Sequence, residues 1–209
     1  MKHVKRIGLA AVAAAALIAF VGAGTASATV VCSAQENPCS GANKWPAGTV
    51  IAATLKTTGK LVTTDEKTTL DTCTGSTIEG RLTSTGSATT TPSGPVELMT
   101  WTGCTFTTKT IQTGGLEIHS ISGTHNGTVT TTGEFRITIN TVLFGSCVFG
   151  VTSGTDLGEL KEGNPAAGVV KMVAQKLSGS EAACPATALA TGEYVQTKPS
   201  GTTVSIEQS

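Results

Sequence analysis

Short β-branched segments bounded by glycine recur along the chain, and they constrain its fold more than any other feature. Their side chains alternate with a period of two, which is typical of β-strands. Many short strands with frequent turn signals predict an all-β fold, an antiparallel β-sandwich with Greek-key connections. The predicted strands are Gly48–Lys56, Ser76–Ser84, Val96–Gly103, Glu134–Asn140, Gly168–Leu177 and Thr202–Gln208.

Two stretches rich in turn-forming residues interrupt these strands. Ser84–Pro95 (STGSATTTPSGP) and Lys161–Gly168 (KEGNPAAG) are predicted to be loops, because serine, glycine and proline favour turns. Neither is long enough to establish a domain boundary. We therefore predict one secreted all-β domain over residues 29–209, and residues 84–95 mark the place of any subdivision.

The first 28 residues have the composition of a secretory signal peptide. MKHVKRIG carries Lys2, Lys5 and Arg6, an apolar run follows, and small residues end at Ala28. This order of basic, apolar and small residues predicts cleavage after Ala28 and a secreted, extracellular product. The apolar run is short for a bilayer span and no basic cluster follows it, so we expect no membrane span in the mature protein.

The charge of the chain disfavours one class of partner. The full chain has 14 basic and 14 acidic residues, and cleavage after Ala28 removes three of the basic ones. The mature chain keeps only Arg81 and Arg136 as arginines and has no cluster of lysines. Binding to nucleic acid depends on neutralising phosphates, so we expect no nucleic-acid partner. An extracellular molecule or surface is the expected partner, and composition does not identify it.

All six cysteines follow the predicted signal peptide. An even number in an oxidising compartment predicts three disulfides that staple the fold. We favour sequential pairing, because shorter loops close at a lower entropic cost. A zinc site is disfavoured, since the chain has no CxxC pair and no histidine close to a cysteine, and no cofactor is expected. The favoured pairs are Cys32–Cys39, Cys73–Cys104 and Cys147–Cys184.

The segment LEIHSISGTHNG, Leu116–Gly127, contains a strong hairpin signal. Asn126-Gly127 favours a two-residue type I′ turn, because that turn needs positive φ at both central residues. The same asparagine begins an N-glycosylation sequon, Asn126-Gly127-Thr128. The register that the turn implies sets apolar against apolar and charge against opposite charge. The predicted cross-strand pairs are Ile118–Phe135, Leu116–Ile137, Glu117–Arg136 and His119–Glu134.

His119 and His125 are the histidines of the mature chain, and both lie in this segment. In the predicted hairpin they are roughly 20 Å apart, so one metal ion cannot bind both. His119 is interpreted as a cross-strand partner of Glu134. Ser120 points to the opposite face of the strand and so cannot be the nucleophile of a base at His119. We therefore predict no catalytic, metal-binding or cofactor-binding residue here.

Two further features invite a catalytic interpretation. Asp65, Glu66 and Asp71 lie close together in TTDEKTTLD, and paired carboxylates catalyse glycoside hydrolysis. The stretch is polar and turn-like, which favours a solvated face. Aromatic residues are also too few for a sugar-stacking groove. Trp101 is predicted to pack beside a disulfide, because Cys104 follows it closely.

Several runs resemble a group of uncharacterised secreted, disulfide-containing β-rich proteins of high-GC Gram-positive bacteria. The runs are WPAGTVIAATLKTTGKLVTT, DTCTGSTIEGRLTSTG, GSCVFGVTSGTDLGELKEGNP and ACPATALATGEYVQT, which together cover most of the mature chain. The resemblance implies secretion and an all-β fold, and it favours pairing of Cys147 with Cys184. It implies no catalytic or binding residue.

Three functional hypotheses follow. The preferred one is an extracellular β-sandwich module with a non-catalytic binding or structural role at or outside the cell envelope. The second is a secreted hydrolase whose catalytic residues come from separate loops. The third is a protease inhibitor that presents a rigid loop, such as the one closed by Cys32 and Cys39.

Overall fold

A computed structural model describes residues 29–208 of the chain. The predicted signal peptide, residues 1–28, lies outside the described residues. Residues 29–208 form fourteen β-strands and no helix, and hence no helix long and apolar enough to cross a membrane. The strands are β1 (Thr29–Cys32), β2 (Val50–Leu55), β3 (Gly59–Thr63), β4 (Thr69–Arg81), β5 (Ser93–Cys104), β6 (Thr107–Gln112), β7 (Gly115–Ser120), β8 (Gly127–Thr131), β9 (Phe135–Thr141), β10 (Gly145–Val151), β11 (Asp156–Lys161), β12 (Ala167–Lys176), β13 (Thr187–Lys198) and β14 (Ser205–Gln208).

Each segment predicted as a strand lies on a strand, and the pairing is antiparallel throughout these residues. The all-β prediction is therefore confirmed. The ambiguous segment Gly168–Leu177 forms most of β12. The loop predicted over Ser84–Pro95 is shorter than expected, because β5 already begins at Ser93, which forms a bridge with Ser84.

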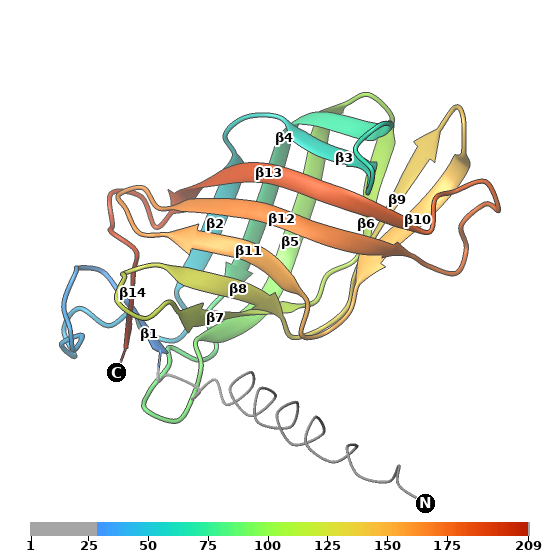
Figure 1. Cartoon of the computed structure of the whole chain (residues 1–209). Coiled ribbons are helices and arrows are strands. Elements are labelled where there is room, and N and C mark those ends of the chain that lie inside the picture. The colour runs from blue at the N-terminus through green and yellow to red at the C-terminus, as the bar shows by residue number, and fades with distance from the viewer. Residues whose placement is uncertain (1–28, 209) are drawn as a thin grey trace, which may run out of the picture.

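The predicted sandwich is replaced by a closed barrel. Twelve strands form one sheet, which closes because β13 pairs with β3 on one side and with β12 on the other. In Figure 1, β13, β12, β11 and β8 pass in front of β2, β4 and β5 at a steep angle. Strands with a period of two satisfy a barrel and a sandwich equally well, so the pattern does not separate them. The closed circuit runs through eight strands, β13, β3, β4, β5, β7, β8, β11 and β12.

β2 and β3 act as one interrupted strand between β4 and β13. β2 pairs with the C-terminal halves of both neighbours and β3 with their N-terminal halves. The chain continues in the same direction from one to the other through residues 56–58, which lie outside both strands. The wall of the barrel is therefore continuous at this position.

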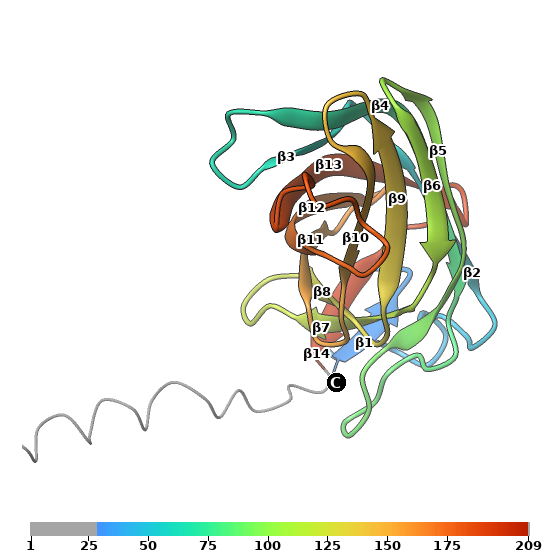
Figure 2. The same ribbon diagram turned by 90° about the vertical axis from the view of Figure 1, so that its right-hand side faces the viewer.

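β6, β9 and β10 form a three-stranded extension of the barrel, called here the β6–β9–β10 extension. β10 pairs with β12 at only two positions, Phe149 with Lys176 and Gly150 with Gln175. β9 pairs with β10 on one side and with β6 on the other. Figure 2 shows β9, β6 and β5 side by side, so the extension folds back against the barrel wall.

Two glycines allow the chain to pass between the extension and the barrel. Gly114 lies between β6 and β7, and Gly133 lies between β8 and β9. A Cβ atom on Gly114 would lie 2.8 Å from the carbonyl carbon of Gly133. Because real Cβ atoms do not approach backbone so closely, the two connections can cross only with glycine at this contact.

The structure contains two hydrophobic cores. The larger one lies inside the barrel and beneath the β6–β9–β10 extension. The smaller one lies at one end of the barrel, where the β1–β14 ribbon packs against β7 (Figure 1). The larger core includes Leu61, Leu70, Ile139, Phe149, Val151 and Ala174. The smaller core includes Val31, Trp45, Leu82, Ala166, Val204 and Ile206.

Three disulfides join the six cysteines in the sequential pairing that loop length favours. Cys32–Cys39 closes a short loop beside the β1–β14 ribbon, and Cys73–Cys104 joins β4 to β5. Cys147–Cys184 joins β10 to the connection between β12 and β13. The last bond therefore ties the β6–β9–β10 extension to the barrel.

The predicted hairpin at Asn126-Gly127 is wrong in its turn and its register. β7 pairs with β8 rather than with β9, and residues 121–126 form the loop between them. Positive φ occurs at Gly123, and not at Asn126 or Gly127. Asn126 instead uses its side chain, which donates to Glu159 and accepts from the backbone of Glu162. The observed pairs are Leu116–Thr131, Glu117–Thr130, Ile118–Val129 and His119–Thr128.

Gly127 has a packing role. A Cβ atom there would lie 2.8 Å from Cγ2 of Ile118, 3.0 Å from the carbonyl oxygen of His119 and 3.2 Å from Cγ2 of Ile206. The glycine lets β7 and the β1–β14 ribbon approach β8 closely. An Asn-Gly pair in sequence does not distinguish this requirement from the requirement of a turn.

Candidate functional site

Residues of the barrel and of the β6–β9–β10 extension together line an apolar cavity of about 120 Å³. Four aromatic side chains line it: Trp101, Phe135, Phe149 and Tyr194. Aliphatic side chains from β3, β4, β5, β7, β9, β10, β11, β12 and β13 complete the wall. Ligand sites in proteins are concave and largely apolar, and eight-stranded barrels are wide enough to hold one small ligand. This cavity is therefore the candidate functional site.

Strand alternation explains how this lining arises. On β5, Met99 and Trp101 point inward, while Thr100 between them is exposed. Their partners on β4 are Ile78, which also lines the cavity, and Ser76. The period of two seen in the sequence thus produces a polar outer face and an apolar inner face.

The polar atoms of the aromatic lining are bonded within the protein. The hydroxyl of Tyr194 donates to Oγ of Ser76 at 3.1 Å, and burial raises the pKa of this phenol. Nε1 of Trp101 donates to Oγ1 of Thr110 at 3.0 Å, and that hydroxyl donates to the carbonyl of Met99 at 2.9 Å.

Asp71 is a buried carboxylate in the cavity wall, with only 3% of its surface exposed. Its Oδ1 accepts hydrogen bonds from the backbone N–H of Thr72 at 2.7 Å and of Phe106 at 3.1 Å. Its Oδ2 accepts a hydrogen bond from Oγ1 of Thr108. The carboxylate therefore holds the turn between β5 and β6 against β4.

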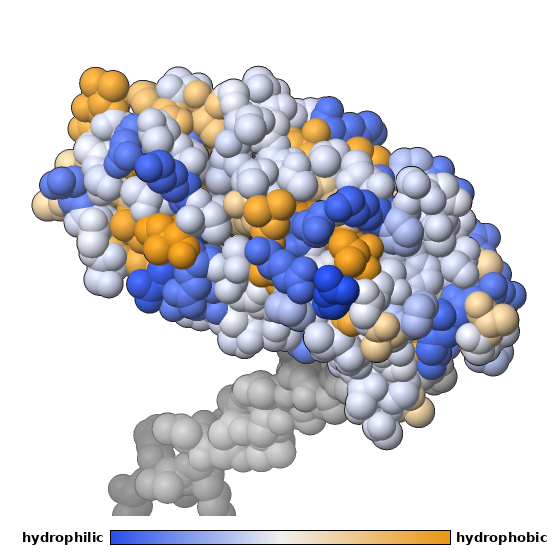
Figure 3. Space-filling view, turned by 180° about the vertical axis from the view of Figure 1, so that it is seen from behind, coloured by the Kyte–Doolittle hydropathy of each residue, from blue (hydrophilic) through white to orange (hydrophobic). Residues whose placement is uncertain are grey.

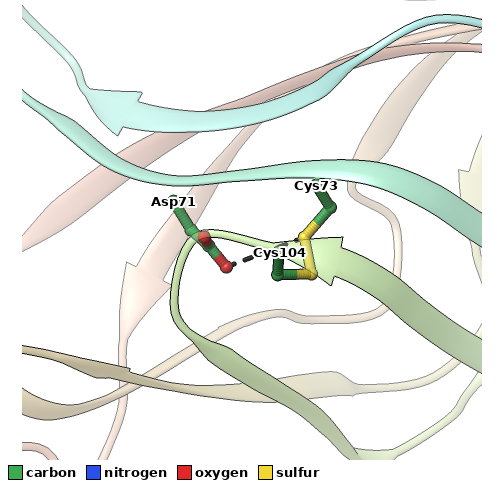
Figure 4. Close-up of side chains that lie close together, drawn as sticks. All are labelled: Asp71, Cys73 and Cys104. Atoms are coloured by element: carbon green, nitrogen blue, oxygen red, sulfur yellow. Dashed lines mark hydrogen bonds between the residues drawn. A yellow bond between two sulfur atoms is a disulfide. The ribbon is translucent and has the colours of Figure 1, made fainter.

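The sulfurs of Cys73 and Cys104 lie beside this carboxylate, as Figure 4 shows. Among the described residues, this is the one group of three potential ligand atoms close enough to share a metal ion. Both sulfurs are joined in a disulfide, so neither is a thiolate, and metal binding by cysteine requires the thiolate. The contact of 3.7 Å from Cys73 Sγ to Asp71 Oδ2 also lacks a hydrogen. The cluster does not have the chemistry of a metal centre.

The three carboxylates that suggested glycoside hydrolysis are not brought together. Asp65 and Glu66 lie exposed in the turn between β3 and β4, as a solvated face predicts. A hydrogen bond from the hydroxyl of Thr63 lowers the pKa of Asp65. Asp71 differs from the prediction, because it is buried in the cavity wall.

His119 does not contact Glu134. Its Nε2 lies 3.1 Å from Oε1 of Glu117, two residues earlier on the same strand, and 3.1 Å from Oγ1 of Thr130 on β8. Glu134 instead accepts hydrogen bonds from Arg136, which raise the pKa of that guanidinium. The imidazole thus has a carboxylate neighbour, but a different one from the predicted partner.

His125 contacts a carboxylate that sequence reasoning missed. Glu207 on β14 is 1% exposed, and its Oε1 lies 2.7 Å from Nδ1 of His125. Ser205 donates to the same oxygen. In a catalytic triad the serine bonds to the imidazole, whereas here both Ser205 and His125 bond to the carboxylate of Glu207. The cluster therefore does not have the arrangement of a nucleophile, base and acid. The cluster fastens the β1–β14 ribbon to the loop after β7.

A side chain of the loop closed by Cys32 and Cys39 bonds to the residue that follows the disulfide. Oε2 of Glu36 accepts a hydrogen bond from the backbone N–H of Ser40 at 3.0 Å, and this bond lowers the pKa of Glu36. Asn37 and Pro38 at its tip are exposed. This tip is the surface that the protease-inhibitor hypothesis invokes.

Trp101 has a role in the cavity that the sequence did not predict. It belongs to the cavity wall together with Cys73, and its indole N–H is bonded to β6 rather than directed at the disulfide. On the outside, the face seen in Figure 3 shows separate apolar patches among polar residues. Scattered apolar residues of this kind are normal on a protein surface. The cavity is therefore the more informative apolar feature. No family model, curated protein or solved structure matches the chain.

Proposed function

We propose that the protein is a secreted, non-catalytic binding module that holds a small apolar molecule inside its barrel. The apolar cavity of about 120 Å³ carries this proposal. An engineered apolar cavity of about 150 Å³ stays dry and takes up benzene or xenon. The expected ligand is therefore a single ring or a short hydrocarbon chain.

The proposed location is outside the cell. The signal peptide predicted over residues 1–28 supports it, as do the three disulfides, because such bonds persist in oxidising compartments. The disulfides link strands of the barrel and of the extension, and they therefore favour a cavity that is preformed in the absence of ligand. Preformed sites bind with a smaller loss of conformational entropy.

Trp101 provides a direct test of ligand binding. The chain has two tryptophans, and Trp45 lies in the smaller core, away from the cavity. A Trp45→Phe variant therefore leaves Trp101 as the single reporter of the cavity. Titration with toluene is expected to change the fluorescence of Trp101 with saturation. It is also expected to raise the midpoint of thermal unfolding, because a ligand that binds only the folded state stabilises it.

A cavity-filling variant separates binding in the barrel from binding on the surface. Ala190 lines the cavity opposite Met172, so Ala190→Leu places an added isopropyl group in the space proposed for the ligand. This change is expected to weaken toluene binding at least about tenfold. Val173→Leu is the matched control, because Val173 lies on the outer face of β12 and is 44% exposed. Equal affinity in the two variants, or no response of Trp101, contradicts the proposal.

A further inference from the structure

Asp71 is unusual among the cavity-lining side chains, because it brings a carboxylate into an apolar wall. A carboxylate has two oxygens and can accept about four hydrogen bonds. Oδ1 receives two, from Thr72 and Phe106, whereas Oδ2 receives one, from Thr108. The neighbouring Cys73 sulfur is in a disulfide and donates none. One acceptor position on Oδ2 is therefore open.

The carboxylate also lacks a basic partner. The ion pairs recorded over residues 29–208 all involve other carboxylates. Asp71 and Thr108 both line the cavity, and Thr108 is the residue that donates to Oδ2. Oδ2 has one bond, from Thr108, and a carboxylate oxygen can accept a second, so a ligand that donates a hydrogen bond has an acceptor available there.

We propose that Asp71 selects small apolar molecules that carry one hydrogen-bond donor, a hydroxyl or an amino group. This inference rests on the proposed function and adds the specificity of the same site. The apolar body of the ligand occupies the cavity among Trp101, Phe149 and Met172, and its donor bonds to Oδ2 of Asp71. Sites built to hydrogen-bond a ligand reject analogues that lack the bonding group, because the buried partner is then left unpaired.

Toluene, phenol and aniline test this selection, because they have nearly the same shape and differ in a methyl, hydroxyl or amino group. Asp71→Asn keeps an oxygen for the N–H groups of Thr72 and Phe106, and it replaces the open acceptor on Oδ2 with an amide donor. The preference for phenol over toluene is expected to be at least about tenfold larger in the wild-type protein than in this variant. The same comparison with aniline separates amino from hydroxyl ligands.

Thr108→Val is the matched control. It removes the hydrogen bond to Oδ2 but keeps the carboxylate, so the preference for phenol is expected to persist. If Asp71 only holds the turn between β5 and β6, both variants lose stability and neither changes the preference. That result overturns the inference.

A measurement on the wild-type protein does not depend on whether the variants fold. Phenol is expected to shift the side-chain carboxyl ¹³C resonance of Asp71, and toluene is expected to leave it in place. Binding of toluene with no preference that depends on Asp71 overturns the selection and leaves the proposed function standing. Failure of all three compounds to affect Trp101 overturns both.

Discussion

Removal of the Cys147–Cys184 disulfide by changing both cysteines to alanine is expected to lower the free energy of unfolding by about 4 kcal/mol. The bond spans a sequence separation of 37, for which the loop-entropy relation gives about 3.8 kcal/mol at room temperature. The Cys32–Cys39 bond spans a separation of 7, for which the same relation gives about 2.4 kcal/mol. The first bond is therefore expected to contribute about 1.5 kcal/mol more than the second.

The structure also predicts which strands open when the Cys147–Cys184 disulfide is removed. β10 pairs with β12 at two positions only, and the disulfide adds a covalent link between β10 and the connection from β12 to β13. The ladder between β12 and β13 is much longer, since it runs from Ala167 to Gln175. Without the disulfide, the extension is expected to open while the barrel wall stays paired.

Urea unfolding of the two double-alanine variants measures the difference in their free energy of unfolding. Hydrogen exchange of the Cys147→Ala, Cys184→Ala variant measures which strands open. Faster exchange should be confined to β6, β9 and β10. A larger loss on removal of Cys32–Cys39 than of Cys147–Cys184 refutes the ranking by loop length. Equal acceleration in β12 and β13 refutes the expectation that the extension opens while the barrel wall stays paired.

Two further changes test the packing. Tyr194 is the only tyrosine, and burial raises the pKa of its phenol above the usual value near ~10. Its contribution to stability is therefore complete below about pH 10 and is lost as pH rises through the folded pKa, a loss that Tyr194→Phe should remove. Phenolate absorbance measures this titration, and a pKa at the usual value contradicts the burial. Gly127→Ala is expected to lower the free energy of unfolding by about 1–3 kcal/mol, because the added Cβ contacts Ile118 and the backbone of His119. The midpoint of thermal unfolding measures this loss. An unchanged midpoint contradicts this close packing.

The strands and the disulfides follow from local features of the sequence. Valine, isoleucine and threonine alternate between glycines, and β5 and β12 show this alternation as inner and outer faces. The sequential pairing of the cysteines agrees with the lower entropic cost of shorter loops. These features depend on residues that lie close in the chain.

The closure of the sheet and the cavity depend on contacts between distant residues. The pairing of β13 with both β3 and β12 decides between a barrel and a sandwich, and a period of two is common to both. The contacts of Asp71 and Glu207 also depend on residues that are distant in the sequence. Asp71 is buried by a turn more than thirty residues later, and Glu207 meets His125 across a separation of 82.

The register of the Asn126-Gly127 segment shows how one local signal can have two physical causes. A type I′ turn and a close approach between strands both require glycine, and only the packing of Ile118 and Ile206 against Gly127 distinguishes them. The complementary pairs of the predicted register were therefore compatible with the sequence but not with the fold.

A crystal structure of the secreted protein under xenon pressure tests the central claim most directly. Xenon enters dry apolar cavities of this size. We predict a xenon site inside the barrel, in the space lined by Trp101, Phe149 and Met172. A barrel interior without xenon, or xenon only at surface positions, contradicts the claim that the barrel holds a small apolar molecule.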